Sequence, residues 1–268
     1  MTRPRRARLD VLLVDRGLAP TRSKAQALVL AGEVFSQGQR LDKPGQLVDV
    51  SVELSVRAGR AWVGRGAQKI APVLEAFGLD PQGRRVLDVG ASTGGFTQLL
   101  LERGAAEVIA LDVGRNQLDW KLRSDSRVHV LEGRNARHLV AGELPFVPDW
   151  AVIDVSFISL EKVLHPVVAC VAPGGTIVAL VKPQFEVGRE HVGRKGLVRD
   201  LERHREVLVR LVRFVLRGGW SVRGIRPAGL KGAQGNQEYF VHIVKTPDQR
   251  PDWQAWIDVA LERCGGDA

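Results

Sequence analysis

Residues 86–97 read VLDVGASTGGFT, and this stretch decides the fold. An apolar run ends in an acid at Asp88, a turn of small residues follows, and a helix-like segment continues to Arg103. A strand, a small-residue turn and a helix in this order are typical of sites that bind a nucleotide-type cofactor.

The turn differs from the glycine-rich turn that binds dinucleotides. Ser92 stands where the second glycine of GxGxxG belongs, and Asp88 would repel a pyrophosphate just before the turn. A cofactor with an adenosine end and a cationic, methionine-like end suits these residues better. The turn therefore predicts S-adenosylmethionine.

Strand-like and helix-like segments alternate along the chain after Gly64. Apolar runs predict strands at 85–89, 108–113, 128–131, 151–155 and 176–181. Helical patterns lie around and between them, at 67–77, 96–103, 117–123, 160–171 and 201–217. Two further strands follow without a helix between them, at 221–225 and 238–244. The pattern predicts an α/β fold with a doubly wound, mostly parallel, Rossmann-like methyltransferase sheet that ends in an antiparallel pair.

The first residues predict a separate, small α+β module. Helical spacing runs from Leu9 to a stop at Gly17, and Thr21 can cap a second helix that ends at Gly32. Short alternating segments follow at 33–35 and 48–56. We therefore expect an N-terminal module at 1–58, a linker at 59–63, a catalytic domain at 64–248 and a C-terminal helix or tail at 249–268.

The charge balance indicates a polyanionic partner. Lys and Arg total 39 against 30 acids, which gives a net charge of +9, and such a balance suits nucleic acid. The two cysteines, Cys170 and Cys264, lie far apart without metal-ligand spacing. No signal peptide or membrane-spanning run is indicated. We expect a cytoplasmic protein with no bound metal and no membrane partner, and the sequence indicates no particular oligomeric state.

Polar residues follow successive predicted strands, where ligands bind in open α/β sheets. Asp88 could hold the cofactor's amino group, Asp112 the ribose hydroxyls and Asn135 the adenine edge. Each of these residues alone could equally be a loop cap. The full set of predicted cofactor contacts is Asp88, Gly90, Ala91, Ser92, Gly94, Gly95, Phe96, Asp112, Val113, Asn135 and Asp154.

Two lysines and two carboxylates mark the predicted reacting end. Asp154 and Lys182 end the fourth and fifth strands, Glu238 begins the last strand, and Lys69 lies on the helix before the sheet. A lysine that closes a buried apolar strand is costly unless it has an acidic partner or a task. The four residues are either a catalytic group or a structural ion-pair network.

Basic residues gather in two regions that we expect to contact RNA. The first 24 residues carry seven basic side chains and two acids. The segment 184–200 follows Lys182 and is expected to be a mobile, RNA-contacting lid rather than an ordinary solvated loop. The predicted RNA contacts are Arg5, Arg6, Arg8, Arg16, Arg22, Lys24, Arg65, Arg189, Arg194 and Lys195.

Five strings together resemble the TlyA family of ribosomal RNA 2′-O-methyltransferases, whose members are sometimes called haemolysins. They are WVGRGAQK at 62–69, DVGASTGGFT at 88–97, DVSFISL at 154–160, VKPQFEVG at 181–188 and GNQEYF at 235–240. The stretch from Arg8 to Val34 resembles the RNA-binding module named for small-subunit ribosomal protein S-four. The resemblance implies an FtsJ-like catalytic domain, methylation of cytidine in ribosomal RNA within subunits, and a Lys-Asp-Lys-Glu tetrad at Lys69, Asp154, Lys182 and Glu238.

One segment departs from the family. Relatives usually carry an aromatic residue and a glycine where this chain has Arg115 and Asn116. The aromatic stacking partner for adenine is therefore missing, although the Arg115 guanidinium could stack in its place.

Within this interpretation Lys182 contacts the target hydroxyl, either as a base or as a charge that stabilises the alkoxide. Asp154 and Lys69 would orient Lys182, and Glu238 would bind the target ribose or Lys69. The alternatives are a ribosome-assembly factor that binds RNA without catalysis, a pore-forming haemolysin, and a methyltransferase of small molecules.

Overall fold

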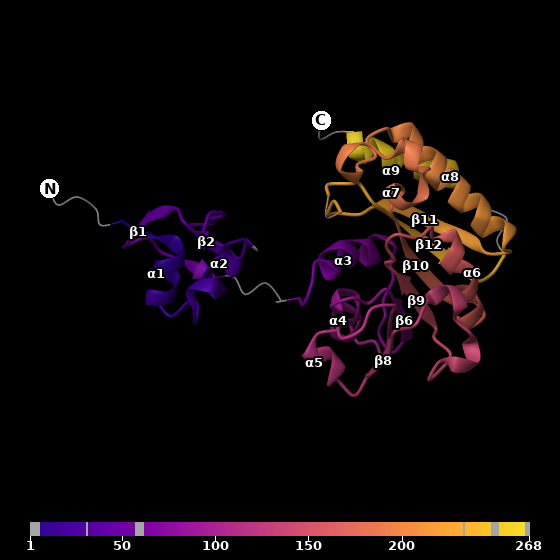
Figure 1. The fold of residues 1–268 in the computed structure, drawn as a ribbon, viewed down its shortest axis with the longest axis horizontal. Coiled ribbons are helices and arrows are strands. Elements are labelled where there is room, and N and C mark those ends of the chain that lie inside the picture. The colour runs from indigo at the N-terminus through magenta and orange to yellow at the C-terminus, as the bar shows by residue number, and fades with distance from the viewer. Residues whose placement is uncertain (1–5, 31, 57–61, 233, 248–251, 266–268) are drawn as a thin grey trace. The chain divides into compact units, whose positions relative to one another are not determined.

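The computed structural model describes residues 6–30, 32–56, 62–232, 234–247 and 252–265, and the chain divides into two units, Met1–Ala61 and Trp62–Ala268. Figure 1 shows both units. Arg5, one of the predicted RNA contacts, lies outside the described residues, as does most of the predicted linker.

The first unit contains two helices and two small sheets. Its elements are β1 (Arg6–Arg8), α1 (Leu9–Asp15), α2 (Arg22–Leu30), β2 (Val34–Ser36), β3 (Gln39–Arg40), β4 (Leu47–Asp49) and β5 (Ser55–Val56). Strands β1 and β4 pair antiparallel, and β2 pairs with both β3 and β5. Leu9, Leu13, Val29 and Val34 are fully buried in the core that these elements share.

Two details of this unit differ from the sequence-based expectation. The segment 48–56 was predicted as one stretch, but its ends belong to different sheets because β4 pairs with β1 and β5 pairs with β2. Between them, Ser51 N donates to Asp49 Oδ1 at 2.8 Å and closes a turn. The short strand β1 lies in the basic arm, where no strand was expected. Both strands depend on partners distant in sequence, which local alternation does not reveal.

The second unit alternates strands and helices as the sequence predicts. Its strands are β6 (Arg85–Val89), β7 (Glu107–Asp112), β8 (Val128–Glu132), β9 (Trp150–Ile153), β10 (Thr176–Val181), β11 (Ser221–Pro227) and β12 (Tyr239–Val244). Its α-helices are α3 (Gly66–Ala76), α4 (Gly95–Glu102), α5 (Trp120–Arg123), α6 (Glu161–Cys170), α7 (Pro183–Glu186), α8 (Leu201–Arg217) and α9 (Trp253–Gly265).

The seven strands form one sheet in the order β11-β12-β10-β9-β6-β7-β8. The strands from β10 to β8 run parallel, and β12 pairs antiparallel with both β10 and β11. This confirms the predicted α/β fold and its antiparallel end. The chain continues from β6 to β7 and β8 on one side, and then returns to form β9 on the other side of β6. The order in which strands are added therefore reverses between β6 and β9, although the two strands are parallel. Ligands bind in open α/β sheets at such a reversal.

Successive residues of each strand face opposite layers of helices. Leu87, Val89 and Ile153 pack in the core with α6, α8 and α9, whereas Val86 and Val152 pack with α3 and α4. Figure 1 shows these two helix layers on the two faces of the sheet. Burial on both faces explains why the parallel strands read as continuous apolar runs.

Two segments are shorter or more ordered than the sequence suggested. The helix expected at 117–123 begins only at Trp120, because the backbone amides of Gln117 and Leu118 donate to Glu132 instead.

The segment 184–200 is not an open loop. It contains α7 and two 3₁₀ turns, η3 (Arg189–His191) and η4 (Arg194–Gly196).

The segment 184–200 is also fixed near its end. Val198 is buried, and its amide donates to Asn236 Oδ1 at 2.9 Å. His204 Nε2 lies 2.9 Å from the Val198 carbonyl oxygen. These contacts attach the basic segment to the stretch that leads into β12, through Asn236, and to α8, through His204.

Candidate active site

The turn after β6 requires glycine at two positions. Gly90 has φ +86°, and a Cβ atom there would lie 2.3 Å from the Asp154 carbonyl oxygen. Gly94 has φ +99°, and its Cβ atom would lie 2.2 Å from Leu122 Cδ1. Left-handed φ and close approach both exclude a side chain. The turn therefore packs directly against the end of β9 and against α5.

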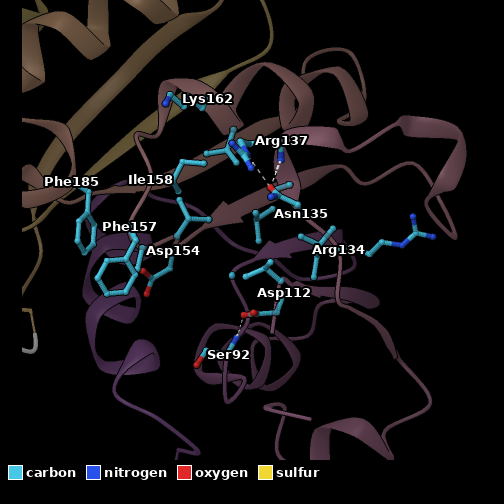
Figure 2. Close-up of a pocket in the computed structure, with 18 of the residues that line it drawn as sticks. Ser92, Asp112, Arg134, Asn135, Arg137, Asp154, Phe157, Ile158, Lys162 and Phe185 are labelled. Carbon is cyan, nitrogen blue, oxygen red and sulfur yellow. Dashed lines mark hydrogen bonds between the residues drawn. The ribbon is translucent and has the colours of Figure 1, made fainter. Parts of the chain in front are cut away.

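A cavity of about 750 Å³ opens at the carboxyl ends of β6, β7 and β9. Val89, Asp112 and Asp154 line it from the ends of three neighbouring strands, as Figure 2 shows for the two acids. A smaller cavity of about 230 Å³ adjoins it at Gly90, Ser92 and Asp154. We call them the main cavity and the side cavity. They lie where the order of the sheet reverses.

Asp112 holds two loops at the wall of the main cavity. Its Oδ2 accepts from Ser92 N at 2.8 Å, and its Oδ1 accepts from Gly114 N at 2.7 Å. The carboxylate is thereby fixed in orientation while it lines the cavity (Figure 2). This position suits its predicted role with ribose hydroxyls, which stays a prediction.

Asn135 combines the two roles that the sequence left open. Its Oδ1 accepts from Arg137 N at 3.1 Å and caps the 3₁₀ turn η1 (Ala136–His138). Asn135 also lines the main cavity (Figure 2). It is thus a cap and a candidate contact for adenine.

Asp88 does not lie on either cavity, which corrects the expectation that it holds the cofactor's amino group. It is fully buried, and its Oδ2 accepts from Thr97 Oγ1 at 2.6 Å. Burial raises the pKa of the Asp88 carboxyl to about 7. Asp88 therefore joins β6 to α4 beneath the turn instead of facing a ligand.

The remaining predicted cofactor contacts divide between the two cavities. Gly90, Ser92, Val113 and Asp154 line the main cavity. The side cavity is lined by Gly90, Ala91, Ser92, Gly95, Phe96 and Asp154. Gly94 lines neither, because it is the point at which the turn packs against Leu122.

Arg115 lies outside the main cavity, so the proposed stacking of its guanidinium on adenine is not seen. Its Nε would lie 2.8 Å from a Cβ atom at Gly133, and it lines a separate shallow pocket with Glu132. Asn116 adopts φ +58°, a left-handed conformation that glycine favours and asparagine tolerates.

Lys182 and Asp154 form one ion pair of the predicted group. Lys182 Nζ lies 2.5 Å from Asp154 Oδ1 and donates to Ser156 Oγ at 2.8 Å. The Lys182 side chain is 10% exposed and that of Asp154 is 22% exposed. Asp154 and Ser156 line the main cavity, so Lys182 contacts two residues of its wall.

Lys69 and Glu238 form the second ion pair. Lys69 Nζ donates to Glu238 Oε2 at 2.6 Å, and both side chains are nearly buried. Gln184 Nε2 donates to Glu238 Oε1 at 3.4 Å. Lys69 was one of the two partners expected for Glu238, and it contacts Glu238. Lys182 is oriented by Asp154, as expected, and by Ser156 in place of Lys69.

The two ion pairs lie close together. In the antiparallel pair of β10 and β12, Val181 is opposite Tyr239, which places Lys182 across from Glu238. Lys69 and Asp154 both line the side cavity. The structure thus brings together all four residues that the sequence singled out, arranged as two pairs.

An aromatic pair at the cavity was not predicted. Phe157 is 89% exposed with φ +62°, and its ring centroid lies 4.9 Å from that of Phe185. Both rings line the main cavity beside Asp154 (Figure 2). The two rings form an exposed apolar surface beside an acid of the predicted catalytic group. The sequence signal was present, since both phenylalanines stand in the strings that contain Asp154 and Lys182.

Basic side chains also line the main cavity. Arg134, Arg137 and Lys162 lie on its rim (Figure 2), and none was assigned from the sequence. Arg134 pairs with Glu143 at 3.1 Å and is otherwise exposed.

The predicted RNA contacts of the first unit differ in their partners. Asp10 is buried, and its carboxylate accepts from Arg8, Arg22 and Gln26. Arg8 and Arg22 remain 45% and 56% exposed. Their guanidinium groups and Gln26 lower the pKa of the Asp10 carboxyl well below its usual range.

Arg16 is exposed, and both of its Nη atoms donate to backbone carbonyl oxygens, those of Val50 and Val52. Its contact with RNA stays a prediction. Arg6 and Lys24 are exposed.

In the second unit, Arg65 lines the side cavity, and its Nη2 donates to the Lys231 carbonyl oxygen at 3.0 Å. Arg194 and Lys195 are exposed in η4; Arg189 lies in η3, and its side chain is outside the described part.

Neither a metal centre nor a membrane-spanning helix is found in the described ranges. No group of three or more His, Cys, Asp and Glu side chains there is arranged to hold a metal ion. Within the same ranges, no helix has both the length and the apolar character needed to cross a membrane.

Comparison with known proteins gives consistent matches. A family model described as FtsJ-like methyltransferase matches residues 62–245, and an S4 domain model matches residues 7–54. The chain is 46% identical over 247 residues to the Mycobacterium tuberculosis protein named 16S/23S rRNA (cytidine-2′-O)-methyltransferase TlyA, covering 91% of this chain and 92% of that one. It is 36% identical over 241 residues to Hemolysin A of Brachyspira hyodysenteriae, covering 88% and 99%. A solved structure described as a candidate hemolysin from Streptococcus thermophilus superposes with a TM-score of 0.76 at 39% identity, covering 98% and 96%.

Proposed function

Because this chain belongs to the FtsJ-like methyltransferase family and carries an S4 domain match, we propose that it transfers a methyl group from S-adenosylmethionine to the ribose 2′-hydroxyl of cytidine in ribosomal RNA. The observation that carries the proposal is the placement of two Lys–carboxylate pairs beside a cavity at the reversal point of the sheet. Such a reaction on ribosomal subunits would take place in the cytoplasm.

The residues around the two cavities fit S-adenosylmethionine. The Asp112 carboxylate is fixed at the wall of the main cavity, where it would accept from ribose hydroxyls, and Asn135 lines the same cavity, where it would contact an adenine edge. No Cβ atom can be accommodated at Gly90, so the turn packs directly on Asp154, and both residues line the two cavities. When bound, this cofactor would supply a methyl group already activated on a sulfonium, so the protein must position the acceptor hydroxyl and assist the loss of its proton.

Lys182 is the residue best placed to act on the acceptor hydroxyl. Its ammonium group is held by Asp154 and Ser156, which both line the main cavity. A fixed positive charge there would orient the hydroxyl oxygen and stabilise the alkoxide that develops as the proton leaves to water. The ion pair with Asp154 favours this electrostatic role over that of a general base.

We assign Glu238 and Lys69 to positioning and not to contact with the acceptor hydroxyl. The Lys69 ammonium neutralises the buried Glu238 carboxylate, and Gln184 contacts the same carboxylate from the segment after Lys182. This pair fixes the start of β12 opposite Lys182. Lys69 also lines the side cavity, where it is available to the polar end of the cofactor.

The surfaces near the site suit an extruded nucleotide. The exposed ring of Phe157, packed on Phe185, offers a stacking face next to Asp154, and base–aromatic stacking is the common means of holding an unpaired base. Arg8, Arg22 and Lys24 offer phosphate contacts in the first unit. The two units thus supply the parts needed for recognising folded RNA and for the reaction.

The experiment that tests the proposal measures transfer of labelled methyl from S-adenosylmethionine to purified small and large ribosomal subunits. We expect label in ribosomal RNA with the wild-type chain and none above background with Lys182→Ala. Binding to subunits without transfer would support a non-catalytic assembly factor instead. Because two of the similar proteins carry the name hemolysin, leakage from lipid vesicles is measured in parallel, and leakage without methyl transfer would contradict the proposal.

A further inference from the structure

The Glu132 carboxylate accepts hydrogen bonds from four donors. It ends β8, directly opposite Asp112 in the parallel pair with β7. Its carboxylate accepts from Asn116 N at 2.9 Å, Gln117 N at 3.1 Å, Leu118 N at 3.4 Å and Arg123 Nη2 at 2.7 Å. The Glu132 side chain is 12% exposed. These donors lower the pKa of the carboxyl to about 2, with Arg123 the largest cause, so Glu132 is charged near neutral pH.

The segment that Glu132 holds forms one wall of the main cavity. Val113 and Gln117 line the cavity. The segment is fixed at its start by Asp112, which accepts from Gly114 N, and from Asn116 onward by Glu132. Gly133 N also donates to the Gly114 carbonyl oxygen at 3.0 Å, which fastens the segment to the residue after Glu132. Two carboxylates at neighbouring strand ends therefore determine where this wall lies.

The local backbone explains why the amides converge on one carboxylate. Asn116 adopts the left-handed conformation, φ +58°, and turns successive N–H groups toward the same point. Arg115 is directed toward Gly133 and away from the cavity. The wall is thus formed by a fixed backbone and by Val113, without a side chain stacked from position 115.

We propose that Glu132 is a positioning residue for the adenosyl end of the cofactor, and that it sets the affinity for adenosine-bearing ligands by fixing residues 113–118. The inference rests on the proposed function, because it takes S-adenosylmethionine as the cofactor. Glu132 itself lines neither cavity, so it acts through the wall and not by contact.

The test compares Glu132→Gln with the wild-type chain by calorimetric titration of S-adenosylmethionine and S-adenosylhomocysteine. An amide retains one acceptor oxygen and loses the charge, so several charge-assisted bonds weaken at once. We expect the Kd of both ligands to rise by about tenfold or more. At saturating cofactor, kcat on RNA should stay within about twofold, because Lys182 and Asp154 are untouched.

Two further variants make the comparison specific. Arg115→Ala is the matched control in the same segment and should leave both Kd values unchanged. Glu132→Asp keeps the charge on a shorter side chain and should recover part of the lost affinity. A Kd for Glu132→Gln within about twofold of the wild-type value, or a loss of kcat without a change in Kd, overturns the inference.

A measurement on the unaltered chain covers the case in which the variants fail to fold. The amides of Asn116, Gln117 and Leu118 should be protected from hydrogen exchange before any ligand is added. Exchange of these amides at the rate of an unprotected loop would contradict the inference. A wild-type chain that binds no S-adenosylmethionine refutes the proposed function, whereas wild-type binding that Glu132→Gln leaves intact refutes only the role of Glu132.

Discussion

Lys182 Nζ lies 2.5 Å from Asp154 Oδ1, and the two residues follow neighbouring parallel strands, β10 and β9. A lysine that ends the buried run Thr176–Val181 would be costly without an acid. The Asp154 carboxylate offsets that cost, and it holds the ammonium group at the wall of the main cavity. Lys182, the residue that we assign to the acceptor hydroxyl, is therefore nearly buried, positively charged and held next to the main cavity by Asp154.

Lys182→Ala should separate chemistry from cofactor binding. Loss of the ammonium group removes the charge that stabilises the alkoxide, so single-turnover methyl transfer should fall by about a thousandfold or more. Affinity for S-adenosylmethionine should stay within a few-fold, because Lys182 is assigned to the acceptor hydroxyl and not to the cofactor. Retained transfer to the natural RNA would contradict the assigned role.

The Lys69–Glu238 pair should be necessary for both stability and activity. Glu238→Ala leaves a buried ammonium group without its partner, so the free energy of unfolding in urea should fall by about 3–5 kcal/mol. The double variant Lys69→Met with Glu238→Leu removes both charges and should recover most of that stability without recovering methyl transfer. Recovery of activity in the double variant would show that the pair is structural only.

Asp88 should make the stability of the fold depend on pH. Its pKa is raised to about 7 in the folded chain by burial, against an ordinary value near 4 in the unfolded chain. The folded state therefore favours the protonated acid. This contribution is complete below about pH 4 and is lost as the pH rises through about 7.

Asp88→Asn tests that dependence, because the amide has a similar shape, accepts from Thr97 and does not ionise. The Tm of the variant minus that of the wild type should increase between pH 4 and pH 8. A difference that stays constant over this range would count against the raised pKa. The variant should also bind S-adenosylmethionine within a few-fold of wild type, since Asp88 lines neither cavity.

The arginines of the first unit should divide into two classes. Arg8 and Arg22 are held by Asp10 with exposed guanidinium groups, so each alanine variant should reduce the slope of log RNA affinity against log salt by about one. Arg16 is occupied by the Val50 and Val52 carbonyl oxygens. Arg16→Ala should lower the Tm and leave the salt slope unchanged; a change in slope as large as that of Arg8→Ala would be evidence against this division.

Much of the fold of the second unit was predictable because its pattern is local. The expected ranges 85–89, 176–181 and 201–217 coincide with β6, β10 and α8. Strands buried on both faces give unbroken apolar runs, and α8 has a one-sided apolar pattern. Segments whose structure depends on distant partners were less predictable, as the division of 48–56 between β4 and β5 illustrates.

The candidate site was predictable to the extent that strand ends mark it. Lys69, Asp154, Lys182 and Glu238 come together because each stands near the end or start of a predicted element. The Lys182–Asp154 contact was expected, and Lys69 was one of two partners expected for Glu238; the sequence alone did not decide between them, because Lys69 and Glu238 are 169 residues apart in the chain. Asp88 was misassigned because its side chain alternates toward α4, and Glu132 was missed because its strand was expected to end one residue earlier.

Mass mapping of the methylated nucleoside is the most direct test of the central claim. Purified ribosomal subunits are incubated with S-adenosylmethionine and either the wild-type chain or Lys182→Ala. The ribosomal RNA from each incubation is then digested to nucleosides. The account predicts a methyl group on the ribose oxygen of cytidine with the wild-type chain and none with the variant. A methyl group on a base, or the same ribose methylation with Lys182→Ala, would contradict it.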